Sequence, residues 1–482
     1  MIYIHSLGLL LNMDFPYVLG CSSCHERAPG DGSYSWCAEC GGFLEYTFDP
    51  EYLKTVQFKG PITFWRYAPV MPRVERSVSL GEGGTPYWRA ERLGEHLGLR
   101  NLHLKDETRN PTSSFKDRAA ALIISDAVGK GFDSVVCATN GNHGASLAAY
   151  SAREDVSCRI VAPNDLDLGK LAQMIASDAQ VEEAGDGIDV AIEKAMKIAE
   201  ETGAYQATTE LNPLSMEALK TVSYELVEQS GVPDWVAVAM GSGVTIHSLW
   251  KGFTELEEAG KIDSKPHLIG VQAEGCAPIA DAFNKHVDAP MSLESGNTIA
   301  SAIRVARPMY GAAALRALKE SDGLSVTIPD SIMIDYGKEI ARHEGIFAEP
   351  ASAASVAFIP ETLESGVIDG SDTVVSIITS SGLKTNDIIQ SLNLRRKSPW
   401  LGTRLATKER ILRRIALKKT YGYALWKELG KEMTLGAVYQ HLKDLETRGL
   451  IASSVEGKRR YLELTEKGEK VLGALENLQL LL

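Results

Sequence analysis

The feature that most constrains the fold is an alternation between residues 81 and 384 of short β-branched runs with longer stretches of helical periodicity. This pattern indicates parallel strands joined by helices, and therefore an α/β class. Ligands bind in such folds where a strand ends in a polar or Gly-rich turn. The candidate strands are residues 102–105, 134–138, 158–162, 235–240, 267–272 and 373–379.

Changes in composition predict four segments in the 482 residues. A Cys- and Gly-rich module occupies residues 1–45, and the α/β core occupies residues 46–394. A linker at residues 395–403 contains a basic cluster followed by a Pro-Trp pair that breaks the pattern. A small unit of helices and a hairpin occupies residues 404–482.

The composition is that of a soluble globular protein, with 44% hydrophobic and 23% charged residues. No stretch approaches the roughly 20 apolar residues that span a bilayer. The apolar run at residues 2–13 has neither a basic flank nor a cleavage site, so we expect a cytoplasmic protein with no membrane partner. Met13 is an alternative start to Met1.

The net charge of -13 is unevenly distributed along the chain. Residues 401–482 hold 16 Lys and Arg against 10 Asp and Glu, whereas the preceding 400 residues hold 34 against 53. A basic tail on an acidic body indicates a C-terminal module with its own partner.

Two Cys-x-x-Cys knuckles lie 12 residues apart near the N-terminus. Each knuckle aims two thiolates at one point, and four thiolates complete a tetrahedral zinc site without an open position for water. We therefore predict a zinc-ribbon-like module with a structural metal. Its ligands are Cys21, Cys24, Cys37 and Cys40.

The segment Asn110-Pro-Thr-Ser-Ser-Phe-Lys-Asp-Arg118 is typical of a turn that opens a helix, because Pro111 starts it and hydroxyl groups can cap it. Lys116 then lies in the first helical turn, near the positive end of the helix dipole. That position helps to lower its amine pKa, which suits a covalent nucleophile.

The same segment closely resembles the Asn-Pro-Thr-Gly-Ser-Phe-Lys-Asp-Arg signature of threonine synthases. The resemblance covers roughly residues 20–390 and implies the two-domain, fold-type-II core of pyridoxal-phosphate (PLP) enzymes, which is tryptophan-synthase-β-like. Further matching segments are Leu80-Gly-Glu-Gly-Gly-Thr-Pro86, Asn212-Pro213 with Lys220-Thr221, Gln272-Ala-Glu-Gly-Cys-Ala-Pro278, Thr298-Ile-Ala-Ser-Ala-Ile303 and Glu344-Gly-Ile-Phe-Ala-Glu-Pro-Ala-Ser-Ala-Ala354.

The resemblance implies roles for individual residues. Lys116 would hold PLP and move protons between the substrate's carbons, while Phe115 flanks the ring. Asn142 would contact the phenolic oxygen of PLP, and Thr379 would face its pyridine nitrogen, where a hydroxyl favours elimination or replacement over transamination. The substrate carboxylate would bind at Ser114, Thr139, Asn140, Gly141 and His143.

The PLP phosphate would bind a Gly-rich loop between a predicted strand and a predicted helix. Consecutive backbone N–H groups at a helix N-terminus bind anions without a basic side chain. The loop consists of Gly241, Ser242, Gly243, Val244 and Thr245.

The chain departs from the family where O-phosphohomoserine is recognised. Glu210, Ser215, His143 and Thr245 replace a Ser, an Arg, a Thr and an Asn, which removes a charge-assisted donor and adds a carboxylate. Two functions therefore remain open. One is synthesis of threonine and phosphate from O-phosphohomoserine and water. The other is elimination from a non-phosphorylated amino acid, as in threonine or serine deaminases and diaminopropionate ammonia-lyases.

Residues 404–482 resemble a winged helix of the PadR or MarR kind, in Gly422-Tyr-Ala-Leu-Trp-Lys-Glu-Leu429, His441-Leu-Lys-Asp-Leu445 and Arg448-Gly-Leu450. The resemblance implies DNA binding, although such modules also join proteins. A third function is therefore an amino-acid-sensing regulator on a PLP-enzyme core. A Leu-rich final helix at residues 471–482 favours a homodimer. Candidate DNA contacts are Tyr439, Gln440, Lys443, Lys458, Arg459 and Arg460.

Overall fold

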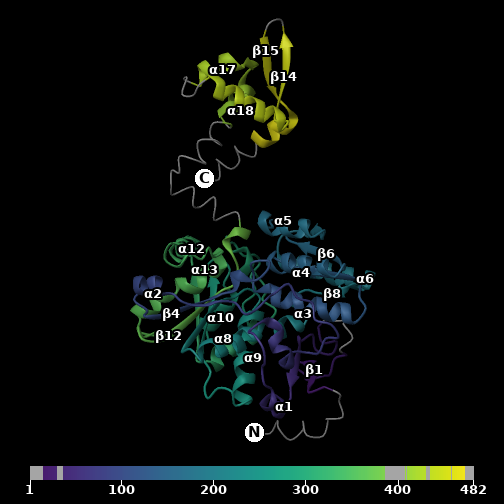
Figure 1. Cartoon of the computed structure of the whole chain (residues 1–482), viewed down its shortest axis with the longest axis vertical. Coiled ribbons are helices and arrows are strands. Elements are labelled where there is room, and N and C mark those ends of the chain that lie inside the picture. The colour runs from purple at the N-terminus through teal and green to yellow at the C-terminus, as the bar shows by residue number, and fades with distance from the viewer. Residues whose placement is uncertain are drawn as a thin grey trace. The chain divides into compact units, whose positions relative to one another are not determined.

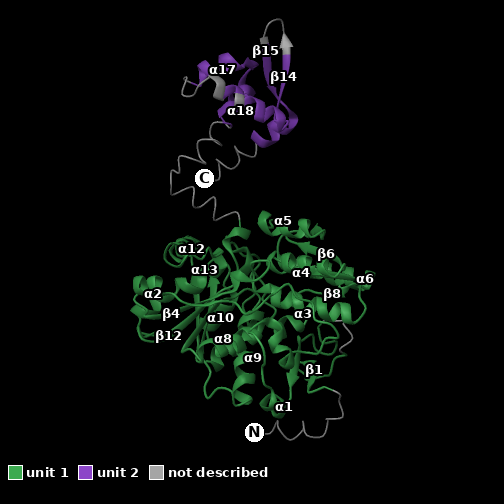
Figure 2. Cartoon of the chain, viewed as in Figure 1, with its two compact units in different colours: residues 1–388 green, residues 389–482 purple. Residues whose placement is uncertain are grey.

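The computed structural model describes residues 15–29, 36–385, 408, 410–429, 435–456 and 459–472. The chain divides into two compact units, residues 1–388 and residues 389–482 (Figure 2). The alternative starts Met1 and Met13, the expected linker at residues 395–403, and Lys458 lie outside the described residues, as does most of the expected final helix. The four-segment division of the chain stays a prediction.

A six-stranded sheet forms the larger lobe of the first unit, in the order β11-β10-β9-β12-β4-β3. All pairs are parallel except β3 with β4. The central strand β9 is buried along its whole length, as its sequence Trp-Val-Ala-Val-Ala predicts. The strands are β3 (Tyr87–Arg89), β4 (Asn101–Asp106), β9 (Trp235–Ala239), β10 (His267–Ala273), β11 (Leu324–Ile328) and β12 (Thr373–Ile378).

A second sheet of four parallel strands forms the smaller lobe, in the order β7-β6-β5-β8. Figure 1 shows α4, α5 and α6 around this sheet, and α2, α12 and α13 around β4 and β12. The six strands that we predicted are confirmed. The strands of this sheet are β5 (Ser134–Ala138), β6 (Ser157–Ala162), β7 (Gln180–Glu183) and β8 (Tyr205–Gln206).

Helices cover both sheets and join the parallel strands, which is the arrangement that the alternating pattern predicts. Both lobes therefore have buried sheets, and the connections leave their turns at the carboxyl ends of the strands. The helices of the first unit are α1 (Pro50–Thr55), α2 (Glu91–Leu97), α3 (Lys116–Gly129), α4 (Asn142–Arg153), α5 (Leu168–Ala176), α6 (Ile188–Thr202), α7 (Leu214–Leu219), α8 (Thr221–Ser230), α9 (Val244–Glu258), α10 (Pro278–Asn284), α11 (Gly311–Glu320), α12 (Asp330–Glu344), α13 (Pro350–Ala357) and α14 (Ile359–Glu364).

The Cys-rich module contributes a two-stranded antiparallel sheet, β1 (Tyr17–Cys21) with β2 (Leu44–Phe48). Alternate residues of β2, namely Leu44, Tyr46 and Phe48, are buried. These side chains belong to the same hydrophobic cluster as residues of α3 and α9. The module therefore packs on the core as part of the first unit.

The second unit has the elements expected of a winged helix, with its own hydrophobic cluster. Residues 410–417 and 466–472 are helical. A three-stranded sheet has the order β13-β15-β14. The remaining elements are β13 (Thr420–Tyr421), α17 (Gly422–Glu428), α18 (Leu435–Thr447), β14 (Ile451–Glu456) and β15 (Arg459–Leu464). Among the described residues, no helix is long and apolar enough to cross a membrane.

Candidate active site and metal site

A cavity that is partly open to solvent collects residues from both lobes of the first unit. Its walls come from the starts of α3, α4 and α9 and from the ends of β5, β9 and β12, as expected for an α/β fold. Of the residues predicted from the sequence, those that line it are Phe115, Lys116, Thr139, Asn140, Gly141, Asn142, His143, Gly241, Ser242, Gly243, Thr245 and Thr379.

Lys116 is the first residue of α3 and the one lysine among the residues that line this cavity. Burial lowers the pKa of its amine, and the carboxylate of Glu210, which also lines the cavity, partly opposes that effect. The amine lies 5.0 Å from the centroid of the Phe115 ring. The neutral fraction of this amine is therefore larger than that of an exposed lysine. Only the neutral form can act as a nucleophile or a base.

The Gly-rich loop connects β9 to α9, and no side chain caps the N-terminus of that helix. Gly243 has a φ of 95°, and a Cβ there would lie 2.7 Å from the carbonyl oxygen of Tyr310. Tyr310 in turn donates its backbone N–H to the carbonyl of Ser242 at 2.9 Å. The backbone of Tyr310 thus fixes the loop, while the N-terminus of α9 offers its free N–H groups to an anion.

The turn before α4 is organised by Thr139. Its Oγ1 accepts hydrogen bonds from the backbone N–H groups of Gly141 and Gly144, at 3.0 and 3.3 Å. A Cβ at Gly141 would lie 2.3 Å from Cδ of Lys170, so the missing side chain makes room for this lysine. The close neighbour of Gly141 is therefore Lys170.

His143 is buried, and burial together with Lys116 lowers its pKa to about 3. The imidazole is therefore neutral near pH 7. Its Nε2 lies 2.8 Å from the carbonyl oxygen of Ala207 and must donate to it, because a carbonyl only accepts. Nδ1 is left as an acceptor with no hydrogen-bond partner among the described residues, beside the cavity.

Asn142 is held by a residue that sequence reasoning missed. Its amide nitrogen donates to both carboxylate oxygens of Glu349, at 3.0 and 3.1 Å, and its Oδ1 accepts from Ser380 at 3.2 Å. Glu349 is 2% exposed and lines the cavity, and Lys170 Nζ lies 3.9 Å from it. The Glu-Pro pair before α13 was visible in the sequence, but the role of Glu349 depends on this long-range contact.

Thr379 follows β12, and its Oγ1 lies 2.8 Å from the Oγ of Ser352. Two predicted residues do not line the cavity. The Ser114 side chain is fully buried and accepts the N–H of Lys116 at 3.4 Å, and the Val244 side chain packs with Phe115 and Tyr310. Ser114 is therefore placed to support the helix start, and Val244 can serve an anion only through its backbone.

These residues fit PLP. An uncapped helix N-terminus behind a Gly-rich loop suits the phosphate, and a buried lysine of lowered pKa suits the aldehyde. Asn142 and Thr379 add polar groups to the lining of the same cavity. Thr379 is a hydroxyl, which does not stabilise a charged pyridine nitrogen as a carboxylate would.

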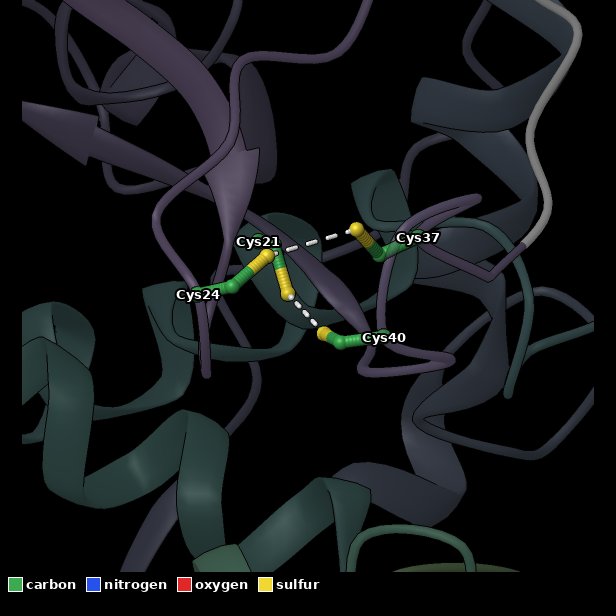
Figure 3. Close-up of side chains that lie close together, drawn as sticks. All are labelled: Cys21, Cys24, Cys37 and Cys40. Atoms are coloured by element: carbon green, nitrogen blue, oxygen red, sulfur yellow. Dashed lines mark hydrogen bonds between the residues drawn. The ribbon is translucent and has the colours of Figure 1, made fainter.

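The four predicted cysteine ligands come together (Figure 3). The Sγ atoms of Cys21 and Cys40 lie 3.4 Å apart and those of Cys24 and Cys37 lie 3.6 Å apart. Thiolates around tetrahedral zinc, at about 2.3 Å from the metal, lie about 3.8 Å from one another. The cluster therefore fits a closed structural zinc site.

The predicted DNA-contacting residues differ in their surroundings. Tyr439 and Lys443, both on α18, are exposed. Arg460 is also exposed but donates to both carboxylate oxygens of Glu446 at 2.8 Å and to Ser453, so it ties the hairpin to α18. The side chains of Gln440 and Arg459 and all of Lys458 lie outside the described residues.

Two protein families match parts of this chain. Residues 78–380 match the family described as "Pyridoxal-phosphate dependent enzyme", and residues 411–474 match the "Transcriptional regulator PadR-like family". The first match covers the whole cavity, and the second covers the helices and hairpin of the C-terminal unit.

Among curated proteins, the chain is 39% identical to the threonine synthase of Methanocaldococcus jannaschii, over 76% of this chain and 93% of that protein. It is 36% identical to the threonine synthase of Mycobacterium bovis, over 64% and 84%. Among solved structures, maize serine racemase has a TM-score of 0.55 at 20% identity, over 64% of this chain and 92% of that one. The last likeness supports the fold.

Proposed function

Because the chain belongs to the family of pyridoxal-phosphate dependent enzymes, and within it to the threonine synthases, we propose that it converts O-phosphohomoserine and water into threonine and phosphate. Lys116 would hold the cofactor aldehyde, the loop at residues 241–245 its phosphate, and Asn142 and Thr379 the polar atoms of its ring. PLP, when bound, supplies an electron sink that stabilises negative charge on the substrate carbons.

The protein's own part in this reaction is proton transfer and orientation. The neutral amine of Lys116 accepts the Cα proton and moves protons between Cα, Cβ and Cγ. The Cγ–O bond breaks, and phosphate leaves with the bonding electrons. Water then adds at Cβ: its oxygen bonds to that carbon and one of its O–H bonds breaks, with the proton passing to the Lys116 amine, so that no oxidant or reductant is required.

The turn Thr139–His143 would bind the substrate carboxylate. Thr139 orients the backbone N–H groups at the start of α4, where the helix dipole favours an anion. Nδ1 of the neutral His143 accepts a hydrogen bond from a substrate donor, because this atom carries no proton. We propose that the Cys₄ cluster binds structural zinc.

The observation that carries the proposal is the position of Lys116, an amine of lowered pKa that lines the same cavity as the Gly-rich loop at an uncapped helix N-terminus. The test is to reduce the protein with borohydride, digest it, and search for a pyridoxyl group on this lysine by mass spectrometry. Turnover is then measured as phosphate and threonine formed from O-phosphohomoserine. A digest without this modification contradicts the proposal.

One observation favours elimination from a non-phosphorylated amino acid as a second candidate. The residues that line the cavity include two carboxylates, Glu210 and Glu349, and one lysine, Lys116, while His143 is neutral. A phosphate dianion bound there has no second cationic side chain on the lining, and this raises the cost of its desolvation. A hydroxyl substituent carries no charge, and an ammonium substituent has the opposite charge to the carboxylates of Glu210 and Glu349.

Separate incubations discriminate between the two reactions. The purified protein is given O-phosphohomoserine, threonine, serine or diaminopropionate, and phosphate, ammonia and 2-oxo acid are measured. Phosphate with threonine supports the synthase. Ammonia with 2-oxo acid from an uncharged amino acid supports the elimination enzyme and contradicts the first proposal.

For the C-terminal unit we propose DNA binding through α18 and the hairpin, on the match to PadR-like regulators and the exposed Tyr439 and Lys443. A gel shift with the DNA upstream of the protein's own gene tests this. DNA binding that depends on an amino acid, in a protein without turnover, would favour the regulator over the enzyme.

A further inference from the structure

The Cys₄ module contacts the part of the core that forms the anion-binding loop. Phe43, in the segment between Cys40 and β2, packs against Tyr310 with the two rings tilted by 33° and their centroids 4.2 Å apart. Tyr310 donates its N–H to Ser242, and its carbonyl lies against Gly243. Tyr310 therefore connects Phe43 of the module to Ser242 and Gly243 of the anion-binding loop.

The backbone around Phe43 is held by the cysteine knuckles. Its carbonyl accepts the N–H of Ser22 at 3.0 Å, and the carbonyl of Gly42 accepts the N–H of Cys37 at 2.8 Å. A Cβ at Gly42 would lie 2.8 Å from Sγ of Cys21, so this residue passes directly over a metal ligand. The position of the Phe43 ring thus depends on the geometry of both knuckles.

The ring itself belongs to a small hydrophobic cluster behind the active site. This cluster contains Phe115, which precedes Lys116, and Val244, the first residue of α9, with Tyr310 between the module and the loop. Phe43 and Met309 pack against it. By packing against this cluster, Phe43 therefore supports both Phe115, beside the lysine of the proposed PLP site, and Val244, in its phosphate-binding loop.

The module also holds α9 along its side. Glu45 of β2 lies 3.4 Å from Nε2 of His247, and the carbonyl of Tyr46 accepts from Lys251 at 2.6 Å. These contacts span the first two turns of the helix whose N-terminus forms the anion site. A helix that shifts along or away from the module would move its N–H groups relative to the cofactor phosphate.

We propose that Phe43 is a positioning residue through which the metal-loaded Cys₄ module holds the phosphate-binding loop, so that loss of the metal weakens retention of PLP. The proposal rests on the PLP site described above. The module has few buried residues apart from those that pack on the core, and four thiolates hold its two knuckles together only when a metal joins them.

The first experiment uses the full-length holoenzyme and the variant Phe43→Ala, which keeps all four thiolates. Zinc is measured by atomic absorption, and the PLP dissociation constant is measured by equilibrium dialysis. We expect unchanged zinc stoichiometry and a PLP dissociation constant raised about 10-fold. This is the usual effect of removing a residue that orients the binding residues without contacting the ligand. The ³¹P resonance of the bound cofactor should also shift, and Phe43→Tyr should restore both values.

Phe15→Ala is the matched control, because Phe15 is an aromatic residue of the same module that stacks on Tyr17, away from this cluster. It should leave the PLP dissociation constant unchanged. A Phe43→Ala protein with wild-type PLP affinity and an unshifted ³¹P resonance would overturn the proposal.

The second experiment removes zinc from the wild-type holoenzyme with a chelator. Zinc should leave before PLP, and added zinc should restore PLP affinity. If the zinc-free protein keeps its circular dichroism spectrum and binds PLP as tightly as before, the proposal fails. A wild-type protein that never binds PLP would instead refute the proposed function itself.

Discussion

The buried carboxylate of Glu349 accepts both hydrogen bonds that the side-chain amide of Asn142 donates, at 3.0 and 3.1 Å. Asn142 opens α4 in the smaller lobe, and Glu349 precedes α13 in the larger one. The pair therefore joins the two lobes at the cavity lining and orients the amide that we assign to the phenolic oxygen of PLP.

Glu349→Gln should lower kcat about 10-fold or more, because outer residues that orient a ligand typically have effects of this size. Glutamine offers Asn142 only one acceptor oxygen, and Lys170 loses the nearby negative charge. The absorbance maximum of bound PLP should shift as well. Glu364→Gln, at an exposed position on α14, is the control. Unchanged kcat and absorbance would remove Glu349 from the orienting role.

Glu210→Gln should lower KM for O-phosphohomoserine about 10-fold, which corresponds to about 1.4 kcal/mol of relieved repulsion. The carboxylate lines the cavity, so its removal favours a dianionic substrate. KM for an uncharged amino acid should change little. Glu201→Gln on α6, where Glu201 is exposed, controls for general charge effects. A raised KM would indicate that Glu210 binds the substrate.

The rate at which the apoenzyme captures PLP should rise with pH, because only the neutral Lys116 amine attacks the aldehyde. The pKa of Lys116 lies below the ordinary 10.5, so the rise should level off at a lower pH than for Nα-acetyl-lysine. Glu210 raises this pKa, and Glu210→Gln should move the midpoint lower still. Stopped-flow absorbance measures both midpoints; equal midpoints for enzyme and free lysine would contradict the prediction.

Arg118→Met should destabilise the protein by about 3–5 kcal/mol, since it leaves buried carboxylates without their partner. Arg118 pairs with Glu107 at 2.7 Å and with Glu225 at 3.0 Å, and all three side chains are fully buried. Lys54→Met removes a pair with Glu51 in which the two side chains are 50% and 77% exposed, and should cost less than about 1 kcal/mol. Urea denaturation gives both values, and similar losses for the two variants would refute the argument.

Lys443→Ala should weaken binding of the C-terminal unit to DNA equally for all sequences, and lower the slope of log K against log salt by about 1. Lys443 is exposed on α18, where its ammonium can pair with a phosphate oxygen. Glu469→Ala, at an exposed position in the helix at residues 466–472, is the control and should leave the slope unchanged. Fluorescence anisotropy at several salt concentrations gives the slope.

In the six-stranded and four-stranded sheets, the strands that the sequence failed to predict are β3, β7, β8 and β11, and all four lie at the edges of these sheets. An edge strand has a neighbour on one side only, so it needs fewer apolar residues. Strand β7 is an example, because none of its four residues is buried. Central strands such as β9 were visible because both faces are covered.

The sequence by itself determined the features that a few neighbouring residues encode: the two cysteine knuckles, the lysine at the start of α3, and the Gly-rich loop before α9. Their spacing sets local backbone geometry, which needs no distant partner. Only the tertiary structure decided that Glu349 holds Asn142, that Lys170 fills the space beside Gly141, and that Phe43 reaches Tyr310. These pairs are far apart along the chain, and the order of the strands and the packing of the lobes, rather than local propensity, bring them together.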